Sequence, residues 1–325
     1  MPATTTERVR LSVAEARALS ERAMRGIGYE SEEARILADH VIDAALCGYE
    51  YSGLPKLLNV AEHPRFRAGR SPMRALKETS VSVLFDGGNQ SGMLAMYHAA
   101  RAVIERAQAH GLAIVGVNNV WMSGRSAYYV EMVARAGLIA IHTVAAPPMV
   151  APLGGARAAL GTNPIAFGFP LEGDPLVIDL GTSAFMGTDL RFRQRLGIPL
   201  PEGVAIDEQG RPTTDAGAAR RGAILPFGGH KGYALALAMH ALGVSAEYVL
   251  IAFTPDLFTT LEDYRRALAA EIAAIKATPR QDGVDEIRVP GERAYRERAR
   301  LTREGIEIDR RIHDALNRLA EGKHA

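Results

Sequence analysis

The chain has 325 residues, of which 47% are hydrophobic and 23% are charged, and its 38 basic residues nearly balance 37 acidic ones. This length can bury a large core, as one large domain or two smaller ones. The near-neutral charge gives no reason to expect a nucleic-acid or membrane-surface partner. The N-terminus lacks the apolar core of a signal peptide, and the sequence contains no long apolar run, so we expect a cytoplasmic protein without a membrane span. The single cysteine, Cys47, excludes an intrachain disulfide and a cysteine-based zinc cluster, and we expect no metal site.

The first 60 residues predict helices. Ser12 and Glu15 form a capping-box pattern, in which each side chain satisfies a free backbone N–H of the first helical turn. This helix ends at Gly26–Gly28. A second helix is predicted from Ser31 to Gly48, because its apolar residues keep helical spacing.

Strands and helices alternate after residue 80. This change places a domain boundary near residue 70. The predicted strands are Val81–Phe85 and Leu112–Val117, then short buried strands in PIAFGF, PLVIDL and GAILPFGG. The predicted helices are Ser91–His110, Ser126–Arg135, Lys231–Leu242, Leu261–Lys276 and Asp309–Glu321.

One glycine-rich segment, Asp86–Gly92 (DGGNQSG), lies where a dinucleotide-binding loop belongs, between a predicted strand and a predicted helix. Asn89 occupies the second glycine position of the G-x-G-x-x-G fingerprint, and no acidic residue ends the next strand. The pattern therefore favours a tight turn with a helix cap. A nucleotide bound here would not be bound by a standard Rossmann domain.

A second glycine-rich segment, FGGHKG, precedes an apolar helix. Gly228, Gly229 and Gly232 leave backbone amides open at the helix start, where Lys231 and the helix dipole add positive charge. This combination suits a phosphate or a carboxylate, although the P-loop spacing is not met. A capped buried helix is the alternative interpretation.

Three further segments carry polar groups beside apolar strands. Asn163 precedes a proline and is compatible with a purely structural turn. Asp179 lies between Ile178 and Leu180 in a strand that looks buried, so its carboxylate must find donors, for a functional or a structural reason. The turn RVPGER, from Arg288 to Arg293, is compatible with exposed charge.

In their order and spacing, these segments resemble the malate/L-lactate dehydrogenase-like family of NAD(P)-dependent oxidoreductases. That family includes ureidoglycolate dehydrogenase, L-sulfolactate dehydrogenase, 2,3-diketo-L-gulonate reductase and Δ1-piperideine-2-carboxylate reductase. The resemblance covers nearly the whole chain. It rests on EEARILADHVIDAALCG, AMYHAARAVIERAQAHGLAIVGV, YYVEMVARAGLIAI, APLGGARAALGTNPIAFGFP, VIDLGTS, GRPTTD, GAILPFGGHKGYALAL, VPGE and GIEI.

The resemblance implies a non-Rossmann α/β fold. A smaller helical domain, residues 1–70, is joined by the C-terminal helix, residues 300–325. A larger cofactor-binding domain, residues 71–299, is built on a mixed, largely antiparallel sheet. Members are typically homodimers that bind NADP or NAD. The implied cofactor-binding residues are Gly161, Thr162, Asn163, Asp179, Thr182, Ser183, His230, Lys231, Gly232, Pro290, Gly291 and Glu292.

The resemblance implies hydride transfer between a nicotinamide and C2 of a 2-keto, 2-hydroxy or cyclic 2-imino acid. Members carry Ser-His-Gly followed three residues later by arginine, and later an Asn-x-x-His segment. Here Tyr51-Ser52-Gly53 falls on the first motif, Lys56 on the arginine, and Met122 on the second histidine. Both family histidines are therefore missing. Lys56 can still hold a carboxylate as a point charge.

The proton donor that replaces these histidines is left open by the sequence. Asp179 is favoured because its motif is intact, and the family's aspartate lies near nicotinamide and substrate. Tyr51, beside Tyr49, is a second candidate if Lys56 lowers its pKa. His230 is a third, although it can simply stack. Trp121 and Met122 are expected to line an enlarged, more apolar substrate pocket with Tyr49.

Two functions of different classes are compatible with the sequence. The first is an NAD(P)H-dependent reductase of divergent specificity for a keto acid or a cyclic imine, because a protonated imine has less need of a histidine acid. The second is a nucleotide-binding member of the family that has lost dehydrogenase chemistry, with a binding role or a non-redox reaction.

Overall fold

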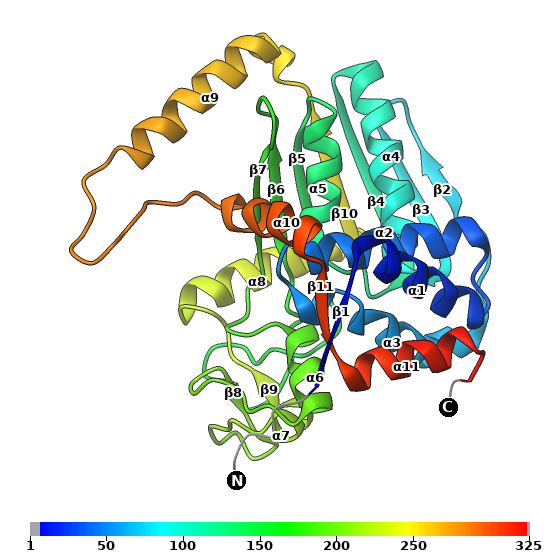
Figure 1. Cartoon of the computed structure of the whole chain (residues 1–325). Helices are drawn as coiled ribbons and strands as arrows, with labels where there is room; N and C mark the ends of the chain where they lie inside the picture. Colours follow the sequence, from blue (N-terminus) through cyan, green and yellow to red (C-terminus); the bar gives the residue numbers. More distant parts are fainter. Residues whose placement is uncertain (1–6, 324–325) are drawn as a thin grey trace.

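The computed structural model describes residues 7–323, and elements from both ends of this range build its helical part (Figure 1). Strand β1 pairs antiparallel with β11, which brings Arg8 opposite Asp309. Apolar faces of the helices enclose one core, to which Ile306, Ile312 and Leu316 contribute from the C-terminal end. The elements of this part are β1 (Arg8–Leu11), α1 (Val13–Gly26), α2 (Ser31–Leu46), η1 (Glu50–Ser52), α3 (Pro55–Ala61), η2 (Pro64–Ala68), β11 (Ile306–Asp309) and α11 (Arg310–Ala320).

The predicted capping box at Ser12 is present. Glu15 N–H donates to Ser12 Oγ at 3.2 Å, and Ser12 N–H donates to the Glu15 carboxylate at 2.8 Å. Strand β1 is a difference from the prediction of helices only. Its four residues gain their hydrogen bonds from a partner about 300 residues later in the chain, which a local pattern does not reveal.

The larger part is built on a seven-stranded sheet with the order β2-β3-β4-β10-β5-β6-β7. Only β3 and β4 are parallel neighbours, and the other pairs are antiparallel. The prediction of a mixed, largely antiparallel, non-Rossmann sheet is confirmed. The strands are β2 (Arg74–Glu78), β3 (Ser82–Ser91), β4 (Leu112–Trp121), β5 (Ile139–Val144), β6 (Ile165–Phe169), β7 (Leu176–Leu180) and β10 (Tyr248–Phe253).

Helices α4 (Gly92–His110) and α5 (Ser126–Arg135) cover one face of this sheet (Figure 1). Their apolar residues form a second core with inward-facing residues of β4, β5 and β10. Helix α8 (His230–Gly243) contacts β5 and β10 at the end of the sheet. Leu112 and Ile114 remain exposed on β4.

A third group of elements lies next to the helical part and has its own small core, built around Val150, Leu190 and Ile224. It consists of α6 (Gly187–Leu196), β8 (Ala205–Ile206), α7 (Ala216–Arg221) and β9 (Ala223–Ile224). GAILPFGG was expected to contain a short buried strand, and its Ala223–Ile224 forms one by pairing with β8. Pro226 makes an isolated bridge with Ser183, and residues 227–229 turn toward α8.

Helix α9 (Leu261–Lys276) follows η3 (Pro255–Leu257) and extends away from the sheet, and none of its residues is buried (Figure 1). The chain then returns to α10 (Glu292–Glu304), which packs on α2. Among residues 7–323, each helix is too short or too polar to cross a lipid bilayer.

The predicted turn over Asp86–Gly92 is wrong. Strand β3 continues to Ser91, and the register with β4 shifts between Asp86 and Gln90. Asn89 takes up this irregularity with φ 58°, a left-handed conformation that asparagine tolerates better than most residues. The segment is therefore a strand with a bulge.

Candidate active site

A cavity of about 370 Å³ lies where η1, the start of α5, the end of β7 and the start of α10 meet. We call it the Asp179 cavity. It joins residues from the helical part with residues of the sheet and of α6. Its lining residues are Tyr49, Tyr51, Ser52, Gly124, Arg125, Ser126, Ala127, Pro164, Val177, Asp179, Gly181, Met186, Thr188, Pro290, Gly291, Ala294 and Tyr295.

Asp179 lies at the end of β7 and accepts hydrogen bonds at the N-terminus of α5. Ala127 N–H donates to its Oδ2 at 2.8 Å, and the Ser126 amide contributes a second bond. The enclosing protein raises the pKa of the Asp179 carboxyl, whereas these amides and Arg125 oppose that rise. The residue is nevertheless accessible to solvent from the cavity. Asp179 therefore offers the cavity a carboxyl group that the helix N-terminus holds in place.

Arg125 is a lining residue that the sequence did not identify. Its Nη1 lies 2.6 Å from Asp43 Oδ2, and Arg298 contacts the other oxygen of Asp43 at 2.6 Å. Its backbone N–H donates to His40 Nε2 at 2.9 Å, and burial lowers the pKa of His40 well below its ordinary value. A neutral, buried His40 thus fixes the loop that carries Arg125. The sequence signal was only a cation directly after Gly124, beside the lost histidine position.

Two tyrosines of the helical part face the cavity. The Tyr49 ring lies 4.6 Å from the Arg293 guanidinium and 5.1 Å from that of Arg125, in cation–π contacts. The Tyr51 ring meets it edge-on at 6.1 Å. The expectation that Lys56 lowers the pKa of Tyr51 is wrong, because burial raises that pKa to about 12. Tyr51 therefore keeps its proton at neutral pH and is a poor acid.

Lys56 lies behind the cavity wall and is only 3% exposed. Its Nζ donates to Thr188 Oγ1 at 3.2 Å, and Thr188 lines the cavity. Among residues 7–323, no carboxylate lies within ion-pair distance of Lys56. Burial, with a smaller contribution from Arg191, lowers the pKa of Lys56 to about 8. Ser52, at the other family histidine position, also lines the cavity and is buried.

The segments implied to bind the cofactor are joined by backbone contacts. Thr182 N–H donates to Thr162 O at 3.0 Å, and Phe227 N–H donates to Thr182 O at 3.2 Å. A Cβ at Gly232 would lie 2.3 Å from Phe227 O, so the α8 start fits closely against this turn. Asn163 links two backbones, with Nδ2 donating to Ala236 O at 2.9 Å and Oδ1 accepting from Ala146 N–H at 3.0 Å. Both polar atoms of the Asn163 side chain are therefore engaged by backbone groups.

The remaining cofactor candidates divide into two places. Pro290 and Gly291 line the cavity, and Glu292 follows them at the start of α10, where it pairs with Lys276. His230 and Lys231 are exposed at the start of α8, outside the residues that line the cavity. Gly161 precedes Thr162 in the chain, and Ser183 follows Thr182. Ser183 Oγ donates to Phe185 O at 2.8 Å.

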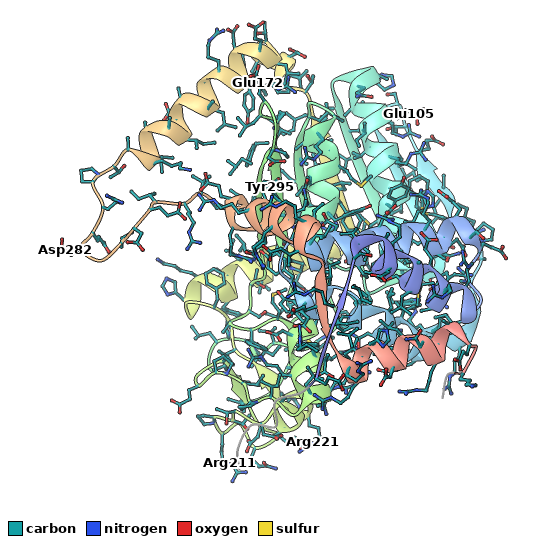
Figure 2. The ribbon with its side chains drawn as sticks, in the orientation of Figure 1. Glu105, Glu172, Arg211, Arg221, Asp282 and Tyr295 are labelled. Atoms are coloured by element: carbon teal, nitrogen blue, oxygen red, sulfur yellow. The ribbon has the colours of Figure 1, made fainter. Side chains whose placement is uncertain are left out.

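Trp121 and Met122 do not line the Asp179 cavity. Trp121 is buried in the core of the helical part, where its indole N–H donates to Asn89 O at 3.0 Å and its ring stacks on His63 at 4.3 Å. Met122 packs against the same core with φ 56°. These contacts occupy both side chains. Tyr295, labelled in Figure 2, lines the cavity instead from α10. Its hydroxyl donates to Pro175 O at 2.9 Å.

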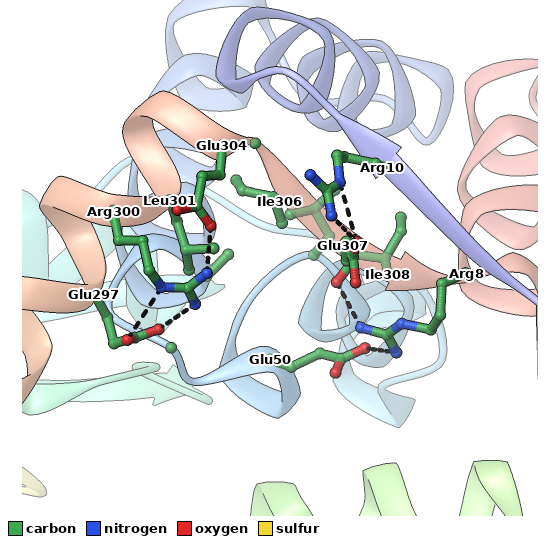
Figure 3. Close-up of a pocket in the computed structure, with 14 residues that line it drawn as sticks. Arg8, Arg10, Glu50, Glu297, Arg300, Leu301, Glu304, Ile306, Glu307 and Ile308 are labelled. Atoms are coloured by element: carbon green, nitrogen blue, oxygen red, sulfur yellow. Dashed lines mark hydrogen bonds and ion pairs between the residues drawn. The ribbon is translucent and has the colours of Figure 1, made fainter.

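A second cavity, of about 310 Å³, lies on the other side of η1, between β1, β11 and α10 (Figure 3). We call it the Arg8 cavity. Each of its charged groups is paired. Arg8 contacts Glu50 at 2.7 Å and Arg10 contacts Glu307 at 2.5 Å. Arg300 holds Glu297 at 2.6 Å and Glu304 at 2.5 Å. These pairs leave no charge for a ligand.

Within residues 7–323, no group of three or more histidine, cysteine or acidic residues is arranged to hold a metal ion.

Comparisons with known proteins agree on one family. The family model described as malate/L-lactate dehydrogenase matches residues 11–317. The malate/(S)-sulfolactate dehydrogenase of Methanothermus fervidus is 31% identical, over 96% of this chain and 97% of that protein. The Δ1-pyrroline-2-carboxylate/Δ1-piperideine-2-carboxylate reductase of Pseudomonas aeruginosa is 32% identical, over 96% of this chain and 100% of that protein. The crystal structure of a dehydrogenase from Sinorhizobium meliloti superposes with a TM-score of 0.89 at 31% identity, covering 97% of this chain and 99% of that one.

Proposed function

The chain belongs to the malate/L-lactate dehydrogenase family of oxidoreductases, and on this premise we propose that it transfers a hydride between NADP or NAD and C2 of a small acid. The acid is a 2-keto acid or a cyclic 2-imino acid in the reducing direction, and a 2-hydroxy or amino acid in the other. The observation that carries the proposal is the composition of the Asp179 cavity. Asp179, Gly181, Pro290 and Gly291 of the cofactor segments face Tyr51 and Ser52 of the substrate segment across it.

The residues present fit a dinucleotide. At the start of α8, Gly228 and Gly229 have φ 53° and 60°, and a Cβ at either would meet nothing within 4 Å. Their open amides, the helix dipole and the exposed Lys231 suit the phosphates, and His230 beside them suits stacking on a ring. Pro290 and Gly291 then suit the nicotinamide end. When bound, the nicotinamide supplies or accepts the hydride.

The substrate requires a cation for its carboxylate and a group that moves a proton. Arg125 lines the cavity, and the Asp43 carboxylate helps to raise its pKa, so it stays charged. Lys56 stands behind Thr188. We therefore place the substrate between Arg125 and Thr188, with C2 near Asp179. The two relatives named above act on acids that carry the reacting group at this position, as their names state, which supports the same class here.

The absence of both family histidines favours a divergent substrate. A cyclic imine can bind already protonated, so it needs an acid less than a keto acid does. The alternative function is a nucleotide-binding protein, or an enzyme for a non-redox step, on the same scaffold. The missing histidines are the observation that favours it.

The test combines binding with turnover. Calorimetry with NADPH and NADH is followed by absorbance at the nicotinamide band with a panel of 2-keto acids and cyclic 2-imino acids. We expect binding and oxidation of one cofactor with at least one acid. Binding without turnover on the whole panel would favour the alternative, and no binding of either nucleotide would refute both functions.

We also propose that the protein is a homodimer. Large apolar side chains lie exposed on α8 and at its end, with Leu237 at 50%, Leu242 at 49% and Val244 at 83% exposure. Exposed apolar patches of this kind mark association surfaces. Sedimentation velocity should give a dimer, and Leu237→Asp with Val244→Asp should shift it to a monomer. A monomeric wild-type chain would contradict the proposal.

A further inference from the structure

Lys56 is a buried cation without a counterion in the part of the chain that the structure describes. Lys56 is 3% exposed, and among residues 7–323 no carboxylate pairs with it. An unpaired charge inside a protein is destabilising, so such a group is retained where it does chemical work or is neutralised by a ligand. The charged and titratable groups that interact with it are Arg191 of α6 and His40 of α2. Neither compensates its charge.

Thr188 connects Lys56 with the Asp179 cavity. An ammonium group only donates hydrogen bonds, so at 3.2 Å the Thr188 oxygen must accept from Lys56 Nζ. The hydroxyl hydrogen of Thr188 is then left to donate elsewhere. Among the described residues no acceptor takes it, and Thr188 lines the cavity together with Asp179 and Gly181. A free O–H donor, backed by a buried ammonium, therefore faces the place where the substrate must lie.

We propose that Lys56, acting through the Thr188 hydroxyl, supplies the proton that the substrate oxygen takes up when a 2-keto acid is reduced. The proposal rests on the function proposed above. C2 accepts the hydride and forms a C–H bond, while the electron pair of the C=O π bond moves to oxygen. That oxygen takes the Thr188 proton, and Thr188 takes a proton from Lys56. Lys56 is left as a neutral amine, which water reprotonates. The reduced nicotinamide is the reductant, and one proton is consumed in each turnover.

The other candidates in the cavity are less suited to this step. Tyr51 holds its proton too tightly, since burial raises its pKa to about 12. Asp179 already accepts hydrogen bonds from the amides of Ser126 and Ala127, whereas the Thr188 hydroxyl hydrogen has no acceptor among the described residues. Lys56, with a pKa lowered to about 8, is protonated at neutral pH and yet gives up a proton easily.

Keto acids and cyclic imines should respond differently to the loss of this proton relay. A keto acid needs a proton at oxygen during reduction. A cyclic imine takes up its proton before the hydride arrives, so it does not need the relay. Loss of the relay should therefore slow the reduction of keto acids far more than the reduction of cyclic imines. A role of Lys56 as a carboxylate holder predicts equal loss with both classes, because both carry the same carboxylate.

The experiment measures both classes with Thr188→Val, Thr188→Ser and Lys56→Arg. We expect kcat for keto acids to fall about 10²-fold or more in Thr188→Val and Lys56→Arg, with KM nearly unchanged. Thr188→Ser should restore most of it, and imine reduction should change less than about threefold. Thr259→Val and Lys77→Arg, both at exposed sites far from the cavity, are the matched controls.

A second readout does not need turnover. The chain has five lysines, so NMR of protein labelled at the lysine ε-carbon can follow each of them. One resonance should titrate near pH 8 and disappear in Lys56→Met. Thr188→Val should leave that titration near its place while it removes keto-acid turnover, which separates a broken relay from a damaged lysine.

Several outcomes would overturn the proposal. Unchanged keto-acid turnover in Thr188→Val, equal losses with both substrate classes, or a Lys56 resonance that does not titrate near pH 8 would each do so. A wild-type chain that reduces only cyclic imines has no use for the relay and also overturns it. If the wild-type protein turns over no acid at all, the proposed function itself is refuted. This outcome is distinguishable from a failed relay because it concerns the wild-type protein and not only its variants.

Discussion

The two cavities on either side of η1 are similar in size and opposite in how they treat charge. In the Arg8 cavity, each arginine is matched by a glutamate (Figure 3). The pairs of Arg8 and Arg10 join β1 to η1 and to β11, whereas those of Arg300 lie within α10. At the Asp179 cavity, Lys56 lies behind the wall without a counterion among the described residues, and Asp179 faces solvent without an ion-pair partner at close range. Paired charges of this kind hold elements together. Unpaired charges in a cavity oppose stability and are typical of sites that bind or react.

The contrast also applies to η1, which contributes residues to both cavities. Glu50 is fixed from the outside by Arg8, whereas Tyr51 and Ser52, the next residues, face inward. One short helix thus has a structural side and a functional side. Substitutions at the Arg8 cavity should change stability alone, whereas substitutions at the Asp179 cavity should also change turnover.

The largest effect on stability is expected at Asp43, which pairs with the cavity residue Arg125. Asp43→Ala leaves Arg125 and Arg298 without their shared carboxylate at 2.6 Å. Breaking a buried charge network in this way destabilises a protein by about 3–5 kcal/mol. Urea denaturation followed by circular dichroism measures it. A loss below about 1 kcal/mol, the size of a surface pair, would show that the network is not a structural support.

Asp179→Ala is expected to have the largest effect on turnover that does not come from unfolding. It removes the acceptor of the Ala127 amide at the start of α5 and the carboxyl group in the cavity. Removal of one preorganised polar group from an active site lowers kcat by about 10²–10³-fold. Asp174→Ala, at an exposed pair with Arg135, is the control. Retained turnover in Asp179→Ala would remove this residue from the site.

Lys56→Met should make the protein more stable at pH 7. The folded-state pKa of Lys56 is about 8, below its ordinary value of 10.5. Below pH 8 the folded chain carries the full penalty of a buried charge, so the variant should gain about 1–3 kcal/mol. Between pH 8 and 10.5 the folded chain releases the proton while the unfolded chain keeps it, so wild-type stability rises with pH and the difference shrinks. A difference that grows with pH over this interval would contradict the burial of the charge.

The smallest effect is expected in the Arg8 cavity. Arg10 is 63% exposed, so Arg10→Ala should cost at most about 0.5 kcal/mol. It should leave kcat and KM unchanged, since Arg10 has no contact with the Asp179 cavity. Thermal unfolding and steady-state kinetics check this together. A clear change in KM would mean that the two cavities are coupled through η1.

The sequence predicted those parts of the molecule that depend on neighbours in the chain. Helix Leu261–Lys276 has the predicted bounds, because Thr260 caps it and its acidic residues start it. The mixed sheet followed from the family resemblance. Asp179 was identified from its position in a buried-looking strand, and the structure brings it to the cavity with Tyr51 and Ser52.

The rest depends on residues far apart in the sequence. Lys56 and Thr188 are separated by 132 positions, and neither pattern nor spacing indicates that they meet. Arg125 reaches the cavity because His40 and Asp43 of α2 hold it there. Trp121 and Met122 were assigned to the substrate pocket, but both pack at the core of the helical part, where Trp121 stacks on His63. Burial and partner choice, which set the pKa of each group, are properties of the packed chain.

The most direct test of this account is NAD(P)H oxidation by the wild-type chain with a 2-keto acid, measured from pH 6 to pH 10. We predict turnover at neutral pH and a fall in kcat as the pH rises past about 8, where Lys56 loses its proton. Absence of turnover would contradict the proposed function. Turnover that stays constant through pH 8 to 10 would contradict the role of Lys56 in it.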